Sequence, residues 1–295
     1  MRILTLDEIR AKIDDAAVID RMRDALIAQA RGECQTPMPM HLEPGAGEVH
    51  IKSSYRRGGK HFVLKMASTF QGRGNGMVLL ASAETGEPEA FLADAGHLTD
   101  VRTAAVAALV ARELCRRDQT IGIIGSGIQA RLAARFHARV LPLRRVYLWG
   151  RTAAHVQSCV DETGRFVGDV AVLSSPSAVA AATRLIVTCT ASREPLLALA
   201  DIEPGTHITA IGADSPGKQE LDPAILRAAE LVLVDSLAQC EKLGELQHAP
   251  DVMPRPIEIG AFCEQSRAFQ KPPEISVADL TGLGVEDLFI AESIL

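Results

Sequence analysis

The stretch TIGIIGSGIQA, residues 120–130, joins a short apolar run to a helix-forming segment through Gly125-Ser126-Gly127. Gly125 permits a tight turn, Gly127 lets the backbone approach a pyrophosphate, and Ala130 is a small residue at the third position of the GxGxxG pattern. The N-terminus of the following helix would offer free N–H groups and a positive dipole end. The stretch therefore predicts the first turn of a dinucleotide-binding domain. A glycine-rich turn in another kind of α/β domain is the alternative.

The sequence shows two different patterns of predicted secondary structure. From about Gln119 to LVLVDS (231–236), short apolar runs alternate with helical segments, which predicts βαβ units and a parallel sheet. Ahead of it lie β-rich segments at 48–55, 61–70 and 76–92. A long Ala-rich helix, LTDVRTAAVAALVAREL, follows them, with Thr99 or Asp100 as its expected N-cap.

These patterns predict an α/β protein of two domains. Residues 118–270 would form a Rossmann-type NAD(P)-binding domain with a parallel sheet. Residues 1–117, rejoined by 277–295, would form a second, α+β domain, to which the family resemblance given below assigns substrate binding and dimerisation, with the active site between the two domains.

The end of the second strand of the Rossmann-type domain indicates the cofactor. VYLWGRT (146–152) places Arg151 and Thr152 where NAD-selective domains carry an acid for the ribose 2′-hydroxyl. A guanidinium beside a hydroxyl suits a 2′-phosphate, so NADP(H) is favoured and NAD(H) stays possible. Alternatively, Arg151 is a solvated residue at the start of the next helix. The predicted cofactor-binding residues are Gly125, Ser126, Gly127, Ile128, Gln129, Arg151, Thr152, Thr103, Thr188 and Lys218.

Bulk properties exclude several classes of function. A net charge of −6 over 295 residues, without a long basic run, argues against nucleic acid as a partner. The six cysteines form no CxxC pair, which predicts reduced thiols, a cytoplasmic location and no metal site. No run reaches the roughly 20 apolar residues of a membrane span, and the first residues lack the apolar core of a signal peptide.

An acid stands at the end of a buried strand in THITAIGADSPGKQELD, residues 206–222. Asp214 could form a turn, cap a helix or serve as the acid of an active site. Asp222-Pro223 already has the pattern of a helix start, which weakens the cap interpretation.

Four motifs taken together resemble the ornithine cyclodeaminase/μ-crystallin family: GSGIQA, DVRTAA, FVLK and IGADSPGKQELD. The resemblance runs from about residue 30 to the last helix, and GEVHIKSSY and AGHLTDVRTAA are most similar to its ectoine-utilisation branch. It implies a homodimer, a nicotinamide cofactor, and Asp214 as general acid/base beside the substrate nitrogen. A carboxylate shielded from water can have a pKa suited to that task.

Two basic residues stand at unexpected places. Lys65 interrupts an apolar strand, and Arg102 falls in the expected first turn of the long helix, where the dipole disfavours a cation. The resemblance implies that both bind the substrate α-carboxylate and that Lys65 belongs to the catalytic group. Internal salt bridges with Asp94, Asp100 or Glu89 are the alternative.

The chain departs from its relatives at Pro39 and His50, where many members carry charged residues. Lys52 would share a strand face with His50 and could replace a lost cation, so both join the predicted substrate site. His50 as an ordinary surface residue stays open, and the other histidines have no metal-ligand spacing.

A cyclodeaminase also needs an acid to hold the distal amine of its substrate, and the position that relatives use for it is His50 here. This difference favours an imine or ketimine reductase, or an amino-acid dehydrogenase, acting on a small α-amino or α-imino acid. An ornithine cyclodeaminase-type ammonia lyase with bound NAD is the first alternative. A non-catalytic, NADP-carrying binder of small ligands is the second.

Overall fold

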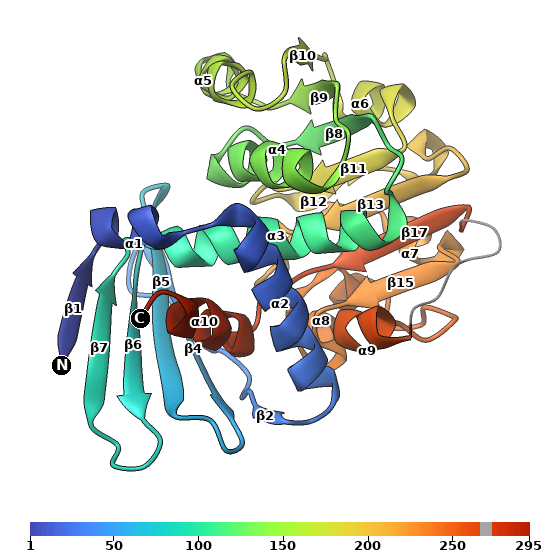
Figure 1. Ribbon diagram of the computed structural model, residues 1–295. Helices are drawn as coiled ribbons and strands as arrows, with labels where there is room; N and C mark the ends of the chain where they lie inside the picture. Colours follow the sequence, from blue (N-terminus) through green and yellow to red (C-terminus); the bar gives the residue numbers. More distant parts are fainter. Residues whose placement is uncertain (266–272) are drawn as a thin grey trace. The chain divides into compact units, whose positions relative to one another are not determined.

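The structure is a computed structural model that describes residues 1–265 and 273–295 (Figure 1). The chain forms two compact units: Met1–Arg102 with Gly282–Leu295, and Thr103–Thr281. These boundaries differ from the expected ones at 117/118 and 277, because one unit ends inside a long helix and residue 277 lies inside a strand. The expected end at residue 270 lies outside the described residues.

The first unit contains a mostly antiparallel sheet, whose order among the described residues is β1-β7-β6-β5-β4-β2, with β3 also paired to β4. Only β1 runs parallel to its neighbour, β7. The strands are β1 (Arg2–Thr5), β2 (Cys34–Gln35), β3 (Met40–Leu42), β4 (Gly47–Arg56), β5 (His61–Phe70), β6 (Arg73–Ser82) and β7 (Pro88–Ala93). The three β-rich segments predicted from the sequence are therefore confirmed.

Helices cover one face of this sheet. They are α1 (Leu6–Lys12), α2 (Asp15–Ala30) and the C-terminal α10 (Gly284–Ser293), which contacts α2 and strands β4, β5 and β6. A capping box of Thr5 and Glu8 starts α1. Gly284 lets α10 approach β4 closely, because a Cβ there would collide with the backbone carbonyl of Ser53.

The long helix α3 (His97–Leu114) begins earlier than predicted. Asp94, rather than Thr99 or Asp100, supplies the side chain at its start, accepting a hydrogen bond of 2.8 Å from the backbone N–H of Leu98. Arg102 consequently lies in the second turn and not the first. The dipole argument for Arg102 therefore has little weight, since the effect fades beyond the first turn.

The second unit contains a fully parallel sheet with the order β10-β9-β8-β11-β13-β17-β15-β16 among the described residues. Its strands are β8 (Thr120–Ile124), β9 (Arg145–Trp149), β10 (Asp169–Val172), β11 (Leu185–Thr188), β13 (Thr206–Ala210), β15 (Leu231–Val234), β16 (Ile257–Glu258) and β17 (Ile275–Asp279). The chain builds outward from β8 in one direction and then returns to β11 on its other side. This reversal is the Rossmann-type switch point, and the predicted α/β class is confirmed.

Shorter elements complete the second unit. Its helices are α4 (Ile128–Val140), α5 (Ala153–Thr163), α6 (Pro176–Ala182), α7 (Pro223–Ala228), α8 (Leu237–Leu243) and α9 (Ile259–Glu264), with 3₁₀ turns η1 (Leu199–Asp201) and η2 (Glu245–His248). Strands β12 (Arg193–Leu197) and β14 (Gln219–Leu221) form a separate pair. None of the described helices has the length and apolar character that crossing a membrane requires.

Replacing Gly284 with Ala should destabilise the protein by about 1–3 kcal/mol, because α10 must move away from β4 to make room. Urea unfolding would measure the change. Gly74→Ala is the matched control, since a Cβ at residue 74 would meet no atom within 4 Å. Equal effects of the two substitutions would contradict the close approach.

Candidate active site

The two glycines of the turn after β8 differ in their surroundings. Gly125 has φ +136°, and a Cβ there would lie 2.6 Å from Cys189 Sγ. Gly127 needs no such explanation, because a Cβ there would meet no atom within 4 Å. Helix α4 also begins without a side-chain hydrogen bond at its N-cap. An uncapped helix N-terminus behind an open glycine fits a pyrophosphate group, whose oxygens would accept the N–H groups.

The end of β9 lies beside this turn. A Cβ on Gly150 would approach within 2.5 Å of Ser126 Oγ, so the two turns are in contact. Arg151 follows with an exposed side chain that makes no hydrogen bond or ion pair to any described residue. Thr152 is the N-cap residue of α5, again without a side-chain capping bond. A basic and a hydroxyl group therefore stand next to the glycine-rich turn.

Asp214 lies in the loop after β13. Its Oδ1 accepts hydrogen bonds from Lys218 Nζ at 2.7 Å and from Ser215 Oγ at 3.1 Å. The Asp214 side chain is 39% exposed and that of Lys218 only 11%. Helix α7 is capped by Asp222, whose side chain accepts from Ala224 N at 2.8 Å, so the predicted cap at Asp222 is confirmed.

The glycine-rich turn and the Asp214 loop lie along one edge of the parallel sheet. Both follow the carboxyl ends of parallel strands, and β11 lies between β8 and β13. Thr188 ends β11 and donates a hydrogen bond of 2.8 Å to Glu220 Oε2. In open α/β sheets, ligands bind at this edge where the strand order reverses.

Glu220 holds that edge together, and the sequence did not single it out. Its carboxylate accepts hydrogen bonds from Thr188 Oγ1, from both N and Oγ1 of Thr190, and from Gly212 N, at 2.6–2.9 Å. It therefore fixes the loops that follow β11 and β13. Burial raises the pKa of Glu220 to about 7, although the hydrogen bonds from Thr190, Thr188 and Gly212 lower it.

Further buried acids continue this pattern. Glu245 accepts from the backbone N–H groups of Glu220 and Leu221 at 2.8 and 3.1 Å. Asp279 accepts from Leu246 N at 3.0 Å. Burial raises the pKa of Asp279 to about 7, and burial followed by the charges of Asp279 and Glu220 raises that of Glu245.

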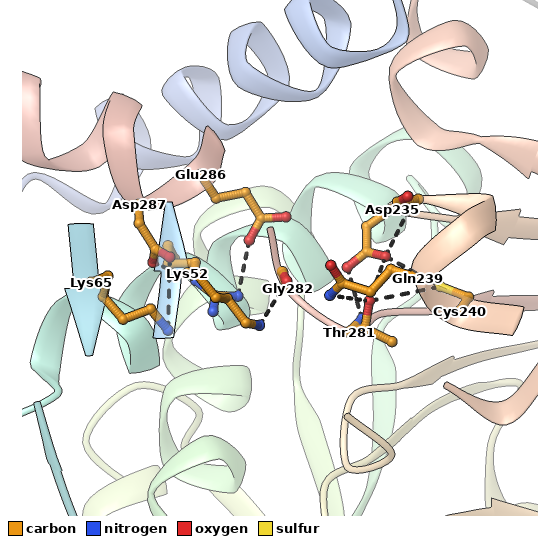
Figure 2. Close-up of polar contacts among 11 residues, drawn as sticks. Lys52, Lys65, Asp235, Gln239, Cys240, Thr281, Gly282, Glu286 and Asp287 are labelled. Atoms are coloured by element: carbon orange, nitrogen blue, oxygen red, sulfur yellow. Dashed lines mark hydrogen bonds and ion pairs between the residues drawn. The ribbon is translucent and has the colours of Figure 1, made fainter. Parts of the chain in front are cut away.

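A related contact fixes the chain after β17. Figure 2 shows Asp235 facing Thr281, whose N–H and Oγ1 donate hydrogen bonds of 2.7 and 3.0 Å to its carboxylate. Gln239 Nε2 donates to Thr281 Oγ1 at 2.9 Å, and Cys240 Sγ lies 3.2 Å from Asp235 Oδ1. Buried acids thus bind backbone N–H groups throughout this side of the second unit.

The first unit brings Lys52, Lys65 and Arg102 together with two acids of α10. Arg102 NH1 lies 2.9 Å from Glu286 Oε2, and its Nε lies 3.2 Å from Asp287 Oδ1. Lys65 Nζ lies 3.7 Å from Asp287 Oδ2, as Figure 2 shows. Lys52 is opposite Lys65 in the sheet and donates to the carbonyl of Gly282 at 2.7 Å. All five charged side chains are buried.

The acids that pair with these cations differ from those that the sequence suggested. Glu286 and Asp287, which pair with Arg102 and Lys65, were not singled out in the sequence. Asp94, one of the predicted partners, has its pKa raised by burial, and the charge of Lys65 opposes that rise. Glu89 instead pairs with His61 at 3.1 Å. Arg102 and Lys65 therefore form internal ion pairs, but the pairs shown are with Glu286 and Asp287, which are not among the three acids that the sequence suggested.

His50 contacts His41 and Glu48 on the strand face that also carries Lys52. Its ring packs against His41, with centroids 4.6 Å apart, and its Nε2 lies 3.8 Å from Glu48 Oε2. The strand alternation places His50 and Lys52 on the same face of β4, as the sequence predicted.

Comparison with known proteins decides the family. The model of the ornithine cyclodeaminase/mu-crystallin family matches residues 2–295. The chain belongs to this family. An alanine dehydrogenase of Archaeoglobus fulgidus is 31% identical over 310 residues, covering 98% of this chain and 92% of that protein. An iminosuccinate reductase of Paracoccus denitrificans is 31% identical over 222 residues, covering 74% and 68%.

Solved structures of family members have the same fold. An archaeal alanine dehydrogenase dimer with bound NAD matches with a TM-score of 0.89 at 27% identity, covering 100% of this chain and 94% of that one. A lysine cyclodeaminase that recognises L-lysine, L-ornithine and L-2,4-diaminobutyric acid matches with a TM-score of 0.90 at 27% identity, covering 100% and 91%. The family therefore contains dehydrogenases, reductases and cyclodeaminases of amino and imino acids.

Replacing Glu220 with Gln should change how stability depends on pH. Because the pKa of Glu220 is raised from 4.5 to about 7 on folding, its carboxyl contributes stability below pH 4.5 that is lost as the pH rises through 7. The Glu220→Gln variant should not show this fall in stability, because a carboxamide does not ionise in this pH range. Relative to the variant, the wild type should lose on the order of 3 kcal/mol of unfolding free energy between pH 4.5 and 8.

Urea unfolding at several pH values would test this prediction. Glu203→Gln removes an exposed carboxyl from the same unit and should leave the pH dependence unchanged. A constant difference between wild type and Glu220→Gln at every pH would contradict the raised pKa.

Proposed function

We propose that the protein is an NAD(P)-dependent oxidoreductase that interconverts a small α-amino acid and its α-imino acid. The observation that carries the proposal is the shared edge of the parallel sheet. An uncapped helix N-terminus behind Gly127 and the partly exposed Asp214–Lys218 pair both lie there, on either side of β11. That edge combines a place for a dinucleotide with a proton donor, which imine reduction requires.

The substrate carboxylate is assigned to Lys65, Arg102 and Lys52. A guanidinium has five N–H donors and an ammonium three, so these groups can serve Glu286, Asp287 and a further carboxylate together. Burial strengthens such contacts, and Arg102 suits the planar, paired geometry of a carboxylate.

Proton transfer is assigned to Asp214. The nicotinamide, when bound, supplies or accepts the hydride at the substrate carbon. Reduction of a C=N bond then needs one proton at nitrogen, and oxidation releases it. The Asp214 side chain is 39% exposed, enough to exchange that proton, and Lys218 Nζ holds its Oδ1 in place at 2.7 Å.

An activity panel tests the proposal. The purified protein would be assayed with NADPH and NADH against pyrroline-2-carboxylate, piperideine-2-carboxylate, and pyruvate with ammonia, and with ornithine in the absence of added reductant. Reduced-cofactor consumption with an imino acid or with pyruvate and ammonia supports the proposal. Cofactor binding without turnover of any substrate would contradict it and leave a nucleotide-carrying binder.

A cyclodeaminase is the second candidate, supported by one contact. The lyase needs an acid for the distal amine of its substrate, and Glu48 Oε2 lies 3.8 Å from His50 Nε2 on the face of β4 that also carries Lys52. Release of ammonia from ornithine with catalytic NAD, and no net cofactor consumption, would favour this candidate.

Replacing Arg151 with Ala should weaken NADPH binding by about 1–3 kcal/mol and leave NADH binding nearly unchanged, because only NADPH carries a 2′-phosphate. Titration of each cofactor would measure the dissociation constants. Arg144→Ala, an exposed arginine ahead of β9 at the opposite end of the strand, is the control. Equal losses for the two cofactors would contradict the assignment.

Replacing Asp214 with Asn should lower turnover about 10²–10⁴-fold, because the carboxamide keeps the shape and loses the transferable proton. Stability should change by less than about 1 kcal/mol, since the pair with Lys218 is partly exposed. Asp222→Ala is the opposite control: it should cost about 1 kcal/mol of helix capping and spare turnover. A turnover loss below tenfold for Asp214→Asn would rule out the catalytic role.

We further propose a cytoplasmic homodimer, formed through the outer face of the first unit's sheet. Met40, Ile51, Met66 and Met77 lie opposite one another in register across four strands of that face. Met40 is 58% exposed and Met77 36%, an apolar row that a partner would cover.

Light scattering should therefore give about twice 31.6 kDa for the wild type. Met77→Lys should shift the mass toward a single chain, because a charge in an apolar interface is unfavourable. Met253→Lys, at a 75% exposed position in the second unit, should leave the mass unchanged. A wild type that is strictly monomeric at micromolar concentration would remove the dimer.

A further inference from the structure

Two histidines and a glutamate gather where β3 pairs with β4. His41 lies directly opposite His50 in the antiparallel register. Glu48 precedes His50 by two residues, and the strand alternation therefore places both on the same face. The two rings meet edge to face, with centroids 4.6 Å apart and planes at 61°. The pairing of β3 with β4 therefore brings the side chains of His41, Glu48 and His50 close together.

The donor atoms of these side chains are close together. One ligand atom from each of His41, Glu48 and His50 lies within 4.8 Å of the other two. The side chains are only 25%, 28% and 11% exposed, respectively. His41 Nε2 is buried and makes no hydrogen bond to a described residue, although Glu43 Oε1 lies 3.5 Å away. A second carboxylate therefore stands at the rim of the cluster.

We propose that His41, Glu48 and His50 bind a divalent transition-metal ion of the Zn²⁺ type. Two imidazole nitrogens and one carboxylate oxygen form a donor set that Zn²⁺ and Co²⁺ accept, whereas Ca²⁺ and Mg²⁺ prefer oxygen alone. Zn²⁺ ligands lie about 2 Å from the ion and so about 3–4 Å from one another, which rotation of these side chains can reach. Three protein ligands leave a position for Glu43, water or a donor atom of a ligand.

The side chains of this site are gathered by strand pairing. His41 and His50 are nine residues apart, which is not a metal-ligand spacing, and only the register of β3 on β4 brings them together. The site is defined by these three side chains and does not depend on the proposed oxidoreductase activity, although it shares Glu48 and His50 with the cyclodeaminase candidate.

A third histidine of the same unit serves as a control. His61 also contacts two acids, Glu292 at Nδ1 and Glu89 at Nε2. Because these acids lie on opposite ring nitrogens, they cannot share one ion with His61. Like His41 and His50, His61 lies beside carboxylates in the first unit, but its acids do not converge on one point.

Calorimetry with Zn²⁺ and absorption spectroscopy with Co²⁺ test the proposal on the full-length protein after EDTA treatment. We expect one ion per chain, with a Co²⁺ spectrum that lacks thiolate charge transfer. Affinity should fall at least about 100-fold in His41→Asn and His50→Asn, about 10-fold in Glu48→Gln, and not at all in His61→Asn. Circular dichroism in EDTA checks that each variant is folded, and Glu48→Gln keeps the test open if a histidine variant is not.

Three outcomes would overturn the proposal. The first is an absence of stoichiometric binding to the wild type. The second is binding that survives in both His41→Asn and His50→Asn. The third is a thiolate-to-cobalt band, which would place the ion on cysteine instead.

Discussion

The second unit depends on buried carboxylates that accept hydrogen bonds from backbone N–H groups. A buried N–H group without an acceptor costs about 1–3 kcal/mol, and loops at a sheet edge have no ladder partner to supply one. Glu220 serves the loops after β11 and β13, Glu245 serves β14, and Asp279 serves the 3₁₀ turn η2. The acids in turn tolerate burial because they gain these donors. The edge where the glycine-rich turn and Asp214 lie is therefore held by buried carboxyl groups.

The first unit uses the opposite arrangement, with buried cations that bind the acids of its last helix. Glu286 and Asp287 stand in the first turn of α10, where the helix dipole also favours negative charge. Removing either acid would leave a cation buried without its partner, which is more costly than losing the pair. Arg102 and Lys65 consequently have a structural task that is independent of any substrate. Their burial alone is therefore weaker evidence for a substrate site than the sequence suggested.

Local patterns predicted the fold well, and contacts between distant segments were out of reach. The alternation of strand and helix, the glycine-rich turn and the cap at Asp222 all depend on neighbours within a few residues. Asp287 pairs with Arg102 although the two residues are 185 positions apart in the sequence, and no local pattern can predict such a pair. His41 meets His50 only through the register of two strands, which a one-residue slip would abolish. The early start of α3 was missed because Asp94 caps it from outside the helical pattern.

Two of the three acids in the motif IGADSPGKQELD, Asp214 and Glu220, lie six residues apart and have opposite surroundings. Judged by pKa alone, Glu220 would be the better catalytic acid, because burial raises its pKa to about 7 and perturbed groups often mark active sites. Glu220 is fully buried, however, and four donors surround its carboxylate. A substrate therefore has no direct contact with the Glu220 carboxyl in this structure. Asp214 is 39% exposed and held on one oxygen by Lys218 and Ser215. Access therefore outweighs pKa in our proposal: Glu220 fixes the loop, and proton transfer is assigned to Asp214 because its side chain is the more exposed of the two.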